Sequence, residues 1–211
     1  MATSGHSGPP MEAIFSEIYF SHAWGGEESV SGPGSGVQRT AAFRSNLSVL
    51  LEELHAEVLV DAGCGDFNWM KETELAGCRY IGVDVVPDLI RKNEQKYETP
   101  DRTFLNLDLT RDNLPQADVI LCRDCLVHFS FEHIFKAIQN FKRSKSRYLL
   151  TTTFIRWPSN TDIATGEWRQ INLQIPPFDL PKAITLIDEK CEHSGGVYAD
   201  KRLGLWDLTS I

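Results

Sequence analysis

The feature that most constrains the fold is a short apolar run that ends in a carboxylate and turns at once through two glycines. It reads Val58-Leu-Val-Asp61-Ala-Gly63-Cys64-Gly65-Asp66. Glycine has no side chain and reaches positive φ at little cost, so such a turn lets a ligand lie directly against the backbone. The acid at the end of the predicted strand, Asp61, indicates a ligand that carries positive charge.

Strand-like and helix-like patterns alternate along the chain around this turn. Apolar residues recur at helical spacing over 11–20, 43–54 and 131–141, and Pro87 suits the first turn of another helix. Interleaved strands and helices imply parallel crossovers, whereas two late strands without a helix between them fit an antiparallel hairpin. The sequence therefore predicts an α/β fold with a doubly wound, mostly parallel seven-stranded sheet. Its strands are expected at 57–61, 79–84, 103–107, 118–122, 147–153, 183–188 and 203–208.

Length and charge are those of one acidic globular domain. The chain has 211 residues, of which 42% are hydrophobic, enough to bury a sizeable core. We expect a flexible N-terminal arm or lid over residues 1–38 and a single folded domain over 39–211. The net charge of -8 repels phosphate backbones and argues against nucleic acid as a partner. The basic run at 142–147 is interpreted as a solvated helix end.

Cysteine usage and hydropathy indicate the compartment. The five cysteines have irregular spacing, which argues against a disulfide framework. Cys122 and Cys125 have CxxC spacing, but no second pair completes a zinc site. No apolar run reaches the length of a membrane span, and the N-terminus lacks a signal pattern. We therefore expect a cytoplasmic protein without a membrane partner or a bound metal.

Three acids stand at the ends of three successive predicted strands: Asp61, Asp84 and Asp108. In a parallel sheet these ends meet at one edge, where ligands bind. Asp84 suits the two hydroxyls of a ribose, and Asp108 with the backbone N–H of Leu109 suits an adenine ring. Each acid alone is also typical of a helix cap. The three together favour a cofactor that contains a nucleoside.

Two types of cofactor use this architecture. A dinucleotide site requires GxGxxG, with the pyrophosphate at the N-terminus of a helix. Here the third glycine is missing, and Asp61 and Asp66 would repel a diphosphate. The same acids suit S-adenosylmethionine, whose methionine end carries an ammonium and whose sulfur is a cation.

With these motifs the chain resembles the class I S-adenosylmethionine-dependent methyltransferases from about Arg39 to its C-terminus. Residues 61–65 resemble the family's glycine motif, and residues 117–124 resemble its fourth-strand motif. The resemblance implies a Rossmann-like methyltransferase fold, S-adenosylmethionine as cofactor and methyl transfer as the reaction. Trp24, on the arm, is expected to stack on the cofactor or else to anchor the arm. The candidate cofactor-binding residues are Asp61, Gly63, Cys64, Gly65, Asp84, Asp108, Leu109, Arg123 and Trp24.

Residues for the methyl acceptor are expected on the arm and in the loops after the fourth and fifth strands. His128 is a candidate general base, with packing beside a helix as the alternative, and Asp124 is the second catalytic candidate. The polar, aromatic loop over 157–181 is long enough to indicate a function. Its arginines could bind a carboxylate or a phosphate, and its Trp168 could equally complete the core. The candidate acceptor-binding residues are Tyr19, His22, Arg156, Trp157, Trp168 and Arg169.

The sequence thus predicts an enzyme that methylates a small polar acceptor, at oxygen first and at nitrogen next. Two alternatives stay open at this point. One is a non-catalytic binding module with the same fold, and the other is an NAD-dependent oxidoreductase. The identity of the acceptor and the oligomeric state are left open.

Overall fold

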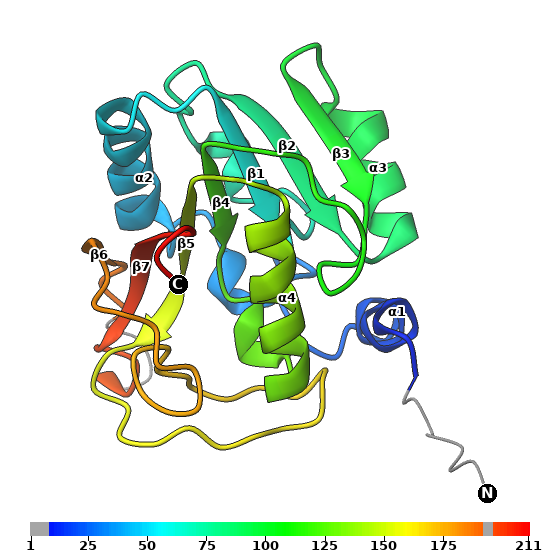
Figure 1. The fold of residues 1–211 in the computed structure, drawn as a ribbon. Coiled ribbons are helices and arrows are strands. Elements are labelled where there is room, and N and C mark those ends of the chain that lie inside the picture. The colour runs from blue at the N-terminus through cyan, green and yellow to red at the C-terminus, as the bar shows by residue number, and fades with distance from the viewer. Residues whose placement is uncertain (1–8, 192–195) are drawn as a thin grey trace, which may run out of the picture.

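The computed structural model describes residues 9–191 and 196–211, so residues 1–8 of the expected flexible arm lie outside the described residues. The described residues form one seven-stranded sheet in the order β3-β2-β1-β4-β5-β7-β6 (Figure 1). Five strands are parallel, and β7 runs antiparallel to both β5 and β6. The strands are β1 Val58–Ala62, β2 Arg79–Asp84, β3 Arg102–Asn106, β4 Val119–Cys122, β5 Tyr148–Phe154, β6 Thr185–Asp188 and β7 Lys201–Asp207.

The predicted fold class is confirmed, because the sheet is mostly parallel and ends in the predicted antiparallel hairpin. Side chains alternate between its two faces, as the period of a strand requires. One face packs with the helix α4 Phe131–Arg143, and the other packs with the helix α2 Ala41–Glu53. The remaining helices are α1 Met11–Ser21 and α3 Pro87–Tyr97, which begins at the predicted proline.

The connection from β1 to β2 contains no α-helix, although the fold class usually places one there. Gly65 and Phe67 both have positive φ, at 57° and 58°, so the chain after β1 cannot continue as an α-helix. Only a 3-10 turn, Met70–Glu72, interrupts the loop. Phe67, Trp69 and Met70 are buried against α2 and the sheet, where they fill the space beside β1.

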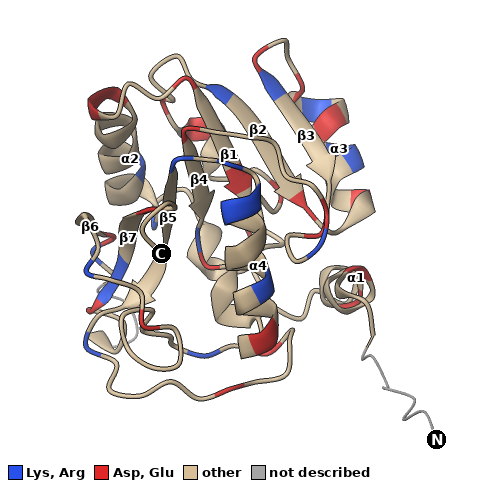
Figure 2. Ribbon diagram, viewed as in Figure 1, with Lys and Arg blue, Asp and Glu red and all other residues tan. Residues whose placement is uncertain are grey.

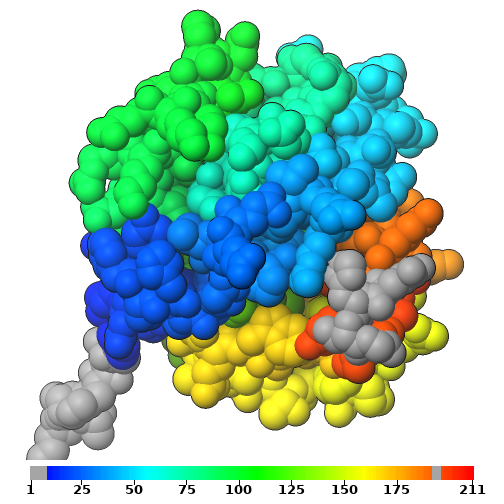
Figure 3. Space-filling model, turned by 180° about the vertical axis from the view of Figure 1, so that it is seen from behind, coloured from blue at the N-terminus to red at the C-terminus, as the bar shows by residue number. Residues whose placement is uncertain are grey.

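The segment over 28–37 lies against this turn. Ser29 Oγ and Val30 N donate to the two carboxylate oxygens of Asp66, each at 3.0 Å. Glu28 accepts from Asn68 Nδ2 at 2.9 Å. On the face shown in Figure 3, the blue N-terminal segment crosses the molecule between its green and cyan half and the yellow segment near residue 170. The part of the arm that the structure describes is therefore packed against the domain.

The long loop after β5 folds against the start of α4. Asp162 accepts from Phe131 N at 2.7 Å, and Thr165 accepts from Ser130 N at 2.9 Å. Phe135 belongs to the predicted apolar stripe of α4 but is 39% exposed, with its ring 5.5 Å from that of Phe178 in this loop. Figure 2 shows acidic and basic residues interspersed over the elements. Among the described helices, none has the length and apolar character needed to cross a membrane.

Candidate active site

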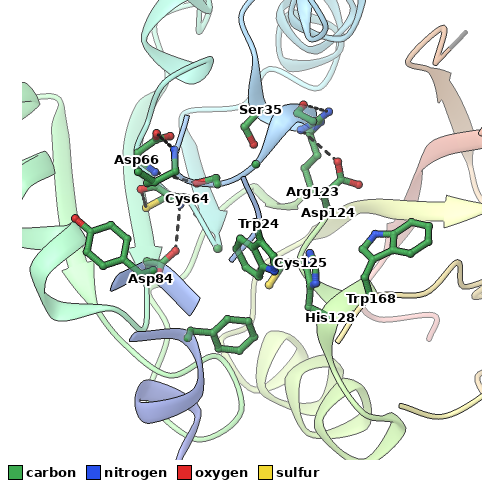
Figure 4. Close-up of a pocket in the computed structure, with 18 of the residues that line it drawn as sticks. Trp24, Ser35, Cys64, Asp66, Asp84, Arg123, Asp124, Cys125, His128 and Trp168 are labelled. Atoms are coloured by element: carbon green, nitrogen blue, oxygen red, sulfur yellow. Dashed lines mark hydrogen bonds and ion pairs between the residues drawn. The ribbon is translucent and has the colours of Figure 1, made fainter. Parts of the chain in front are cut away.

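A cavity of about 610 Å³ lies where the parallel strands end. Its walls come from the turn after β1, the ends of β2 and β4, the N-terminal segment and the loop after β5 (Figure 4). This position is the one at which open α/β sheets bind ligands. The volume falls within the range of small-molecule sites, roughly 300–1,000 Å³.

All nine residues predicted for the cofactor line this cavity. The reason is topological: β1, β2 and β4 are neighbours, and their carboxyl ends bring distant segments to one edge of the sheet. The nine are Trp24, Asp61, Gly63, Cys64, Gly65, Asp84, Asp108, Leu109 and Arg123.

Two of the three acids lie beside the glycine turn, where Asp61 is buried and Asp84 is half-buried. Asp61 accepts from the Tyr80 hydroxyl at 2.7 Å, and burial raises the pKa of Asp61 to about 7 against the lowering effect of that bond. Asp84 accepts from Gly65 N and Val86 N, each at 3.1 Å, and burial also raises its pKa. A cationic ligand would favour the ionised form of both groups, because opposite charges attract strongly at a buried site.

Asp108 has a different environment. One of its oxygens accepts from the backbone N and the hydroxyl of Thr110, at 2.8 and 2.6 Å. The other lies 3.3 Å from Arg111 Nε. Asp108 thus closes its own turn while it lines the cavity, so its predicted contact with adenine stays a prediction.

His128 lies on the wall of the cavity, in a 3-10 turn over Leu126–His128. Its Nδ1 lies 2.9 Å from the carbonyl oxygen of Glu167. A carbonyl only accepts, so Nδ1 carries the proton and Nε2 keeps its lone pair. Burial lowers the pKa of His128, which keeps the imidazole neutral at pH 7. Trp24 stacks on this ring at 4.4 Å between centroids (Figure 4).

Asp124 belongs to a buried network of charges that the sequence analysis did not foresee. Its carboxylate pairs with Lys201, which also lies 2.7 Å from Glu189, and Glu189 lies 2.5 Å from Arg123 Nε. Burial opposes ionisation of Asp124, but Lys201 and Arg123 outweigh burial and hold its pKa well below the usual range. Lys201 and Glu189 stand far from Asp124 in sequence and follow no motif. Only the antiparallel pairing of β7 with β5 and with β6 brings them to this place.

Of the six residues predicted for the acceptor, two line the cavity and four do not. Tyr19 and Trp168 line it. His22 is exposed and ends α1 in a left-handed conformation, and Arg156 and Trp157 are exposed on the loop surface away from the cavity. A polar loop can present its side chains to either side, which periodicity cannot resolve.

Arg169 is the fourth of the predicted residues that do not line the cavity, and its contacts are with the backbone. Its guanidinium donates to the carbonyl oxygens of Leu126, Val127 and Phe129 at 2.6–3.0 Å. It thereby holds the turn that carries His128, so its charge is turned away from the cavity. The prediction that Arg169 binds an anionic group of the acceptor therefore finds no support in its position.

Two aromatic residues that were not predicted from the sequence lie beside Trp168. Phe154 and Tyr198 line the cavity, and the ring of Tyr198 lies 5.5 Å from that of Trp168 and 6.2 Å from that of Phe154. Phe154 ends β5 at the edge where the cavity opens, a position that could have marked it as a candidate. Together the three rings form an aromatic wall on the side away from Asp84.

Comparisons with known proteins bear on this geometry. Residues 60–145 match a family model described as a methyltransferase domain, which covers the glycine turn, all three acids and His128. The chain carries a methyltransferase domain. A comparison of this methyltransferase with curated proteins gives no significant match.

Solved structures share the fold of this methyltransferase at low identity. It is similar to magnesium protoporphyrin IX methyltransferase from Synechocystis PCC 6803 with bound S-adenosylmethionine, at 15% identity and a TM-score of 0.60 over 96% of this chain and 99% of that chain. It is also similar to the N-methyltransferase NodS from Bradyrhizobium japonicum WM9, at 16% identity and 0.58 over 81% and 96%. A third is 1,6-didemethyltoxoflavin-N1-methyltransferase from Burkholderia thailandensis, at 14% identity and 0.58 over 93% and 86%.

The cofactor of the methyltransferase is S-adenosylmethionine, and the cavity fits it. The buried carboxyl group of Asp61 suits its cationic end, and the volume suffices for a nucleoside together with a small acceptor. Among the described residues, no group of three or more His, Cys, Asp or Glu side chains could hold a metal ion.

Proposed function

We propose that the enzyme transfers the methyl group to an oxygen of a small polar acceptor, with His128 as general base. The observation that carries the proposal is the geometry of His128. Its Nδ1 is committed to Glu167, and its neutral ring leaves Nε2 as the proton acceptor on the cavity wall. A hydroxyl is a weak nucleophile and benefits from a base, whereas an unprotonated amine needs one less. The geometry therefore favours oxygen over nitrogen, which is the second candidate.

The cofactor site in this proposal consists of the nine predicted residues on the cavity wall. When bound, S-adenosylmethionine supplies an electrophilic methyl group on a sulfonium. Asp61 offers a buried carboxylate to that end of the cofactor, and the buried residues of the cavity wall limit the access of water. Asp84 is assigned to the ribose and Asp108 to the adenine.

Asp124 is assigned a supporting role rather than that of a base. With its lowered pKa it is a poor proton acceptor. Its negative charge instead favours the imidazolium that forms when His128 takes up the proton of the acceptor. This division of work resembles the way in which a buried carboxylate supports a catalytic histidine elsewhere.

The acceptor is assigned to the aromatic wall formed by Phe154, Trp168 and Tyr198. Three rings at the mouth of a cavity favour a flat, partly apolar molecule with a polar group that reaches His128. The net charge of -8 disfavours nucleic acid as the acceptor. Tyr19, whose hydroxyl accepts from Lys92 Nζ at 2.6 Å, also lines the cavity.

The test combines a binding measurement with a screen for turnover. Calorimetric titration of the purified protein with S-adenosylmethionine and S-adenosylhomocysteine is expected to give saturable binding. Incubation with labelled S-adenosylmethionine and metabolite extracts is then expected to label a small molecule, and mass spectrometry identifies the atom that carries the methyl group. Label on nitrogen alone, or on nucleic acid, would contradict the proposal.

A further inference from the structure

The backbone of the glycine turn has no spare hydrogen-bond donors. Each amide N–H from Gly63 to Asn68 donates to an acceptor inside the protein. Two donate to Val83 O at 2.8 and 3.0 Å, one to Asp84 Oδ2 at 3.1 Å, and one to Ser31 Oγ at 3.3 Å. The last two donate to Cys64 O and to Asp66 Oδ1. An anion at this turn would therefore find its usual backbone donors occupied.

The cofactor nevertheless carries an anion. Its methionine end has an α-carboxylate beside the ammonium, and the side chains at the turn are acidic. Asp61, Asp66 and Asp84 all line this part of the cavity and would repel a carboxylate. Acids at the turn can serve the cationic groups and the ribose hydroxyls of the cofactor, but they leave its carboxylate without a partner. A cation from another segment is therefore expected to bind that carboxylate.

Arg39 is the candidate for this cation. It lines the same cavity, and it makes no hydrogen bond or ion pair with the residues described at 9–191 and 196–211. The other two cations on the wall are engaged, since Arg123 pairs with Glu189 and Lys201 pairs with Asp124. The five N–H donors of the Arg39 guanidinium therefore have no acceptor among the residues described here.

Neighbouring contacts fix the backbone of Arg39. Residues 28–37 are tied to the turn through Asp66, and Val37 N donates to Glu28 Oε1 at 2.9 Å. On the other side, Thr40 is fully buried and donates its hydroxyl to Gly36 O at 3.0 Å. Arg39 lies between these anchors with an exposed side chain, so the guanidinium can move while its base is held. Ser35 lines the same wall (Figure 4).

We propose that Arg39 binds the α-carboxylate of S-adenosylmethionine through its guanidinium fork, with Ser35 Oγ as a second donor. The planar fork matches both oxygens of a carboxylate, which makes arginine the suitable residue for this task. The proposal deepens the function proposed above and rests on its cofactor assignment. It makes Arg39 a positioning residue, because the hold on the carboxylate fixes the direction of the sulfonium toward His128.

The test compares two nucleosides that differ in one group. Decarboxylated S-adenosylmethionine keeps the sulfonium and the ammonium but lacks the carboxylate. Calorimetry is expected to show that Arg39→Met weakens the binding of S-adenosylmethionine about tenfold to hundredfold. The affinity for the decarboxylated analogue is expected to change by less than twofold. Arg39→Lys, which keeps the charge but loses the fork, is expected to lie between Arg39→Met and wild type for S-adenosylmethionine.

Arg79→Met is the matched control, since Arg79 is exposed at the start of β2, away from the cavity, and should alter neither affinity. Equal weakening of both nucleosides by Arg39→Met would overturn the proposal, because a merely structural role acts on both. An unchanged affinity for S-adenosylmethionine would overturn it as well. Wild-type protein that binds neither nucleoside would instead refute the cofactor site itself, and the two failures are thereby distinguishable.

Discussion

The carbonyl oxygen of Glu167 lies 2.9 Å from Nδ1 of His128 and fixes which nitrogen of the ring carries the proton. The loop after β5 thus does more than cover the cavity. It sets the tautomer of a residue that belongs to the loop after β4, 39 positions earlier in the chain. This contact and others in the cavity can be tested by substitution and titration.

The first prediction concerns the protonation of His128. Because burial lowers its pKa, we expect its imidazole to titrate below the ordinary value of about 6.5 in an NMR pH titration. Activity that depends on the neutral ring should therefore hold at pH 7 and fall on acidification through that lowered pKa. His128→Gln should reduce kcat by about 10²–10⁴-fold and leave the affinity for S-adenosylhomocysteine within about twofold. A pKa at or above the ordinary value would contradict the assignment.

The second concerns Asp84. Asp84→Ala removes the proposed acceptor for the ribose hydroxyls, so cofactor binding should weaken by on the order of 1–3 kcal/mol. Calorimetry with S-adenosylhomocysteine measures it. Since the carboxylate also accepts from Gly65 N and Val86 N, thermal unfolding of the same variant must be recorded beside binding. An unchanged affinity in a stable variant would refute the ribose contact.

The third concerns the proton on Asp61. With a pKa of about 7, this carboxyl is close to half protonated at neutral pH. A bound cation favours the ionised form, so binding at pH 7 should release part of a proton, and affinity should rise from pH 6 to pH 8. Calorimetry in two buffers of different ionisation enthalpy counts the proton. The Asp61→Asn variant should bind the cofactor more weakly and release a smaller fraction of a proton on binding. Equal proton release by the variant and the wild type would contradict the prediction.

The same pKa has a consequence for folding. Asp61 has a higher pKa in the folded state than its ordinary value of about 3.9, so between the two values the folded state binds more protons. The contribution of this group to stability therefore decreases as pH rises through that window. Comparison of wild type with Asp61→Asn by urea unfolding at pH 5 and pH 8 measures this change.

The fourth concerns the turn that carries His128. Arg169→Met removes three donors to the carbonyl oxygens of 126, 127 and 129, which would then be left without these partners. We expect a loss of roughly 2–4 kcal/mol in the free energy of unfolding. Arg156→Met, in the same loop but with an exposed side chain, should change it by about 0.5 kcal/mol or less. Equal effects of the two substitutions would refute the structural assignment of Arg169.

Much of the fold was predictable because local patterns and topology agree. Alternating apolar segments set the strands, and parallel pairing then brings Asp61, Asp84 and Asp108 to one edge whatever their loops do. The conformation of the β1–β2 connection was not predictable in this way, since positive φ at Phe67 follows from tertiary packing and not from its residue type.

The acceptor side was less predictable for a physical reason. A loop has no period, so the sequence could not indicate that Arg169 points to backbone carbonyls while Trp168, its neighbour, lines the cavity. The pairing of Asp124 with Lys201 was equally hidden, because Lys201 reaches it only through the antiparallel addition of β7. Sequence periodicity locates such strands but does not pair their charges.

The contacts between Asp66 and residues 29–31 have a practical consequence for dissecting this protein. A fragment that starts at residue 39 would retain every strand of the sheet, yet it would lack the chain that lies over the turn. Because α1 also buries Met11 and Phe15 in the core, we expect this fragment to be less stable than the full chain and to lose part of the cavity wall. Supplying residues 9–38 as a separate peptide should restore part of what the shorter fragment loses, as in complementation of a split enzyme.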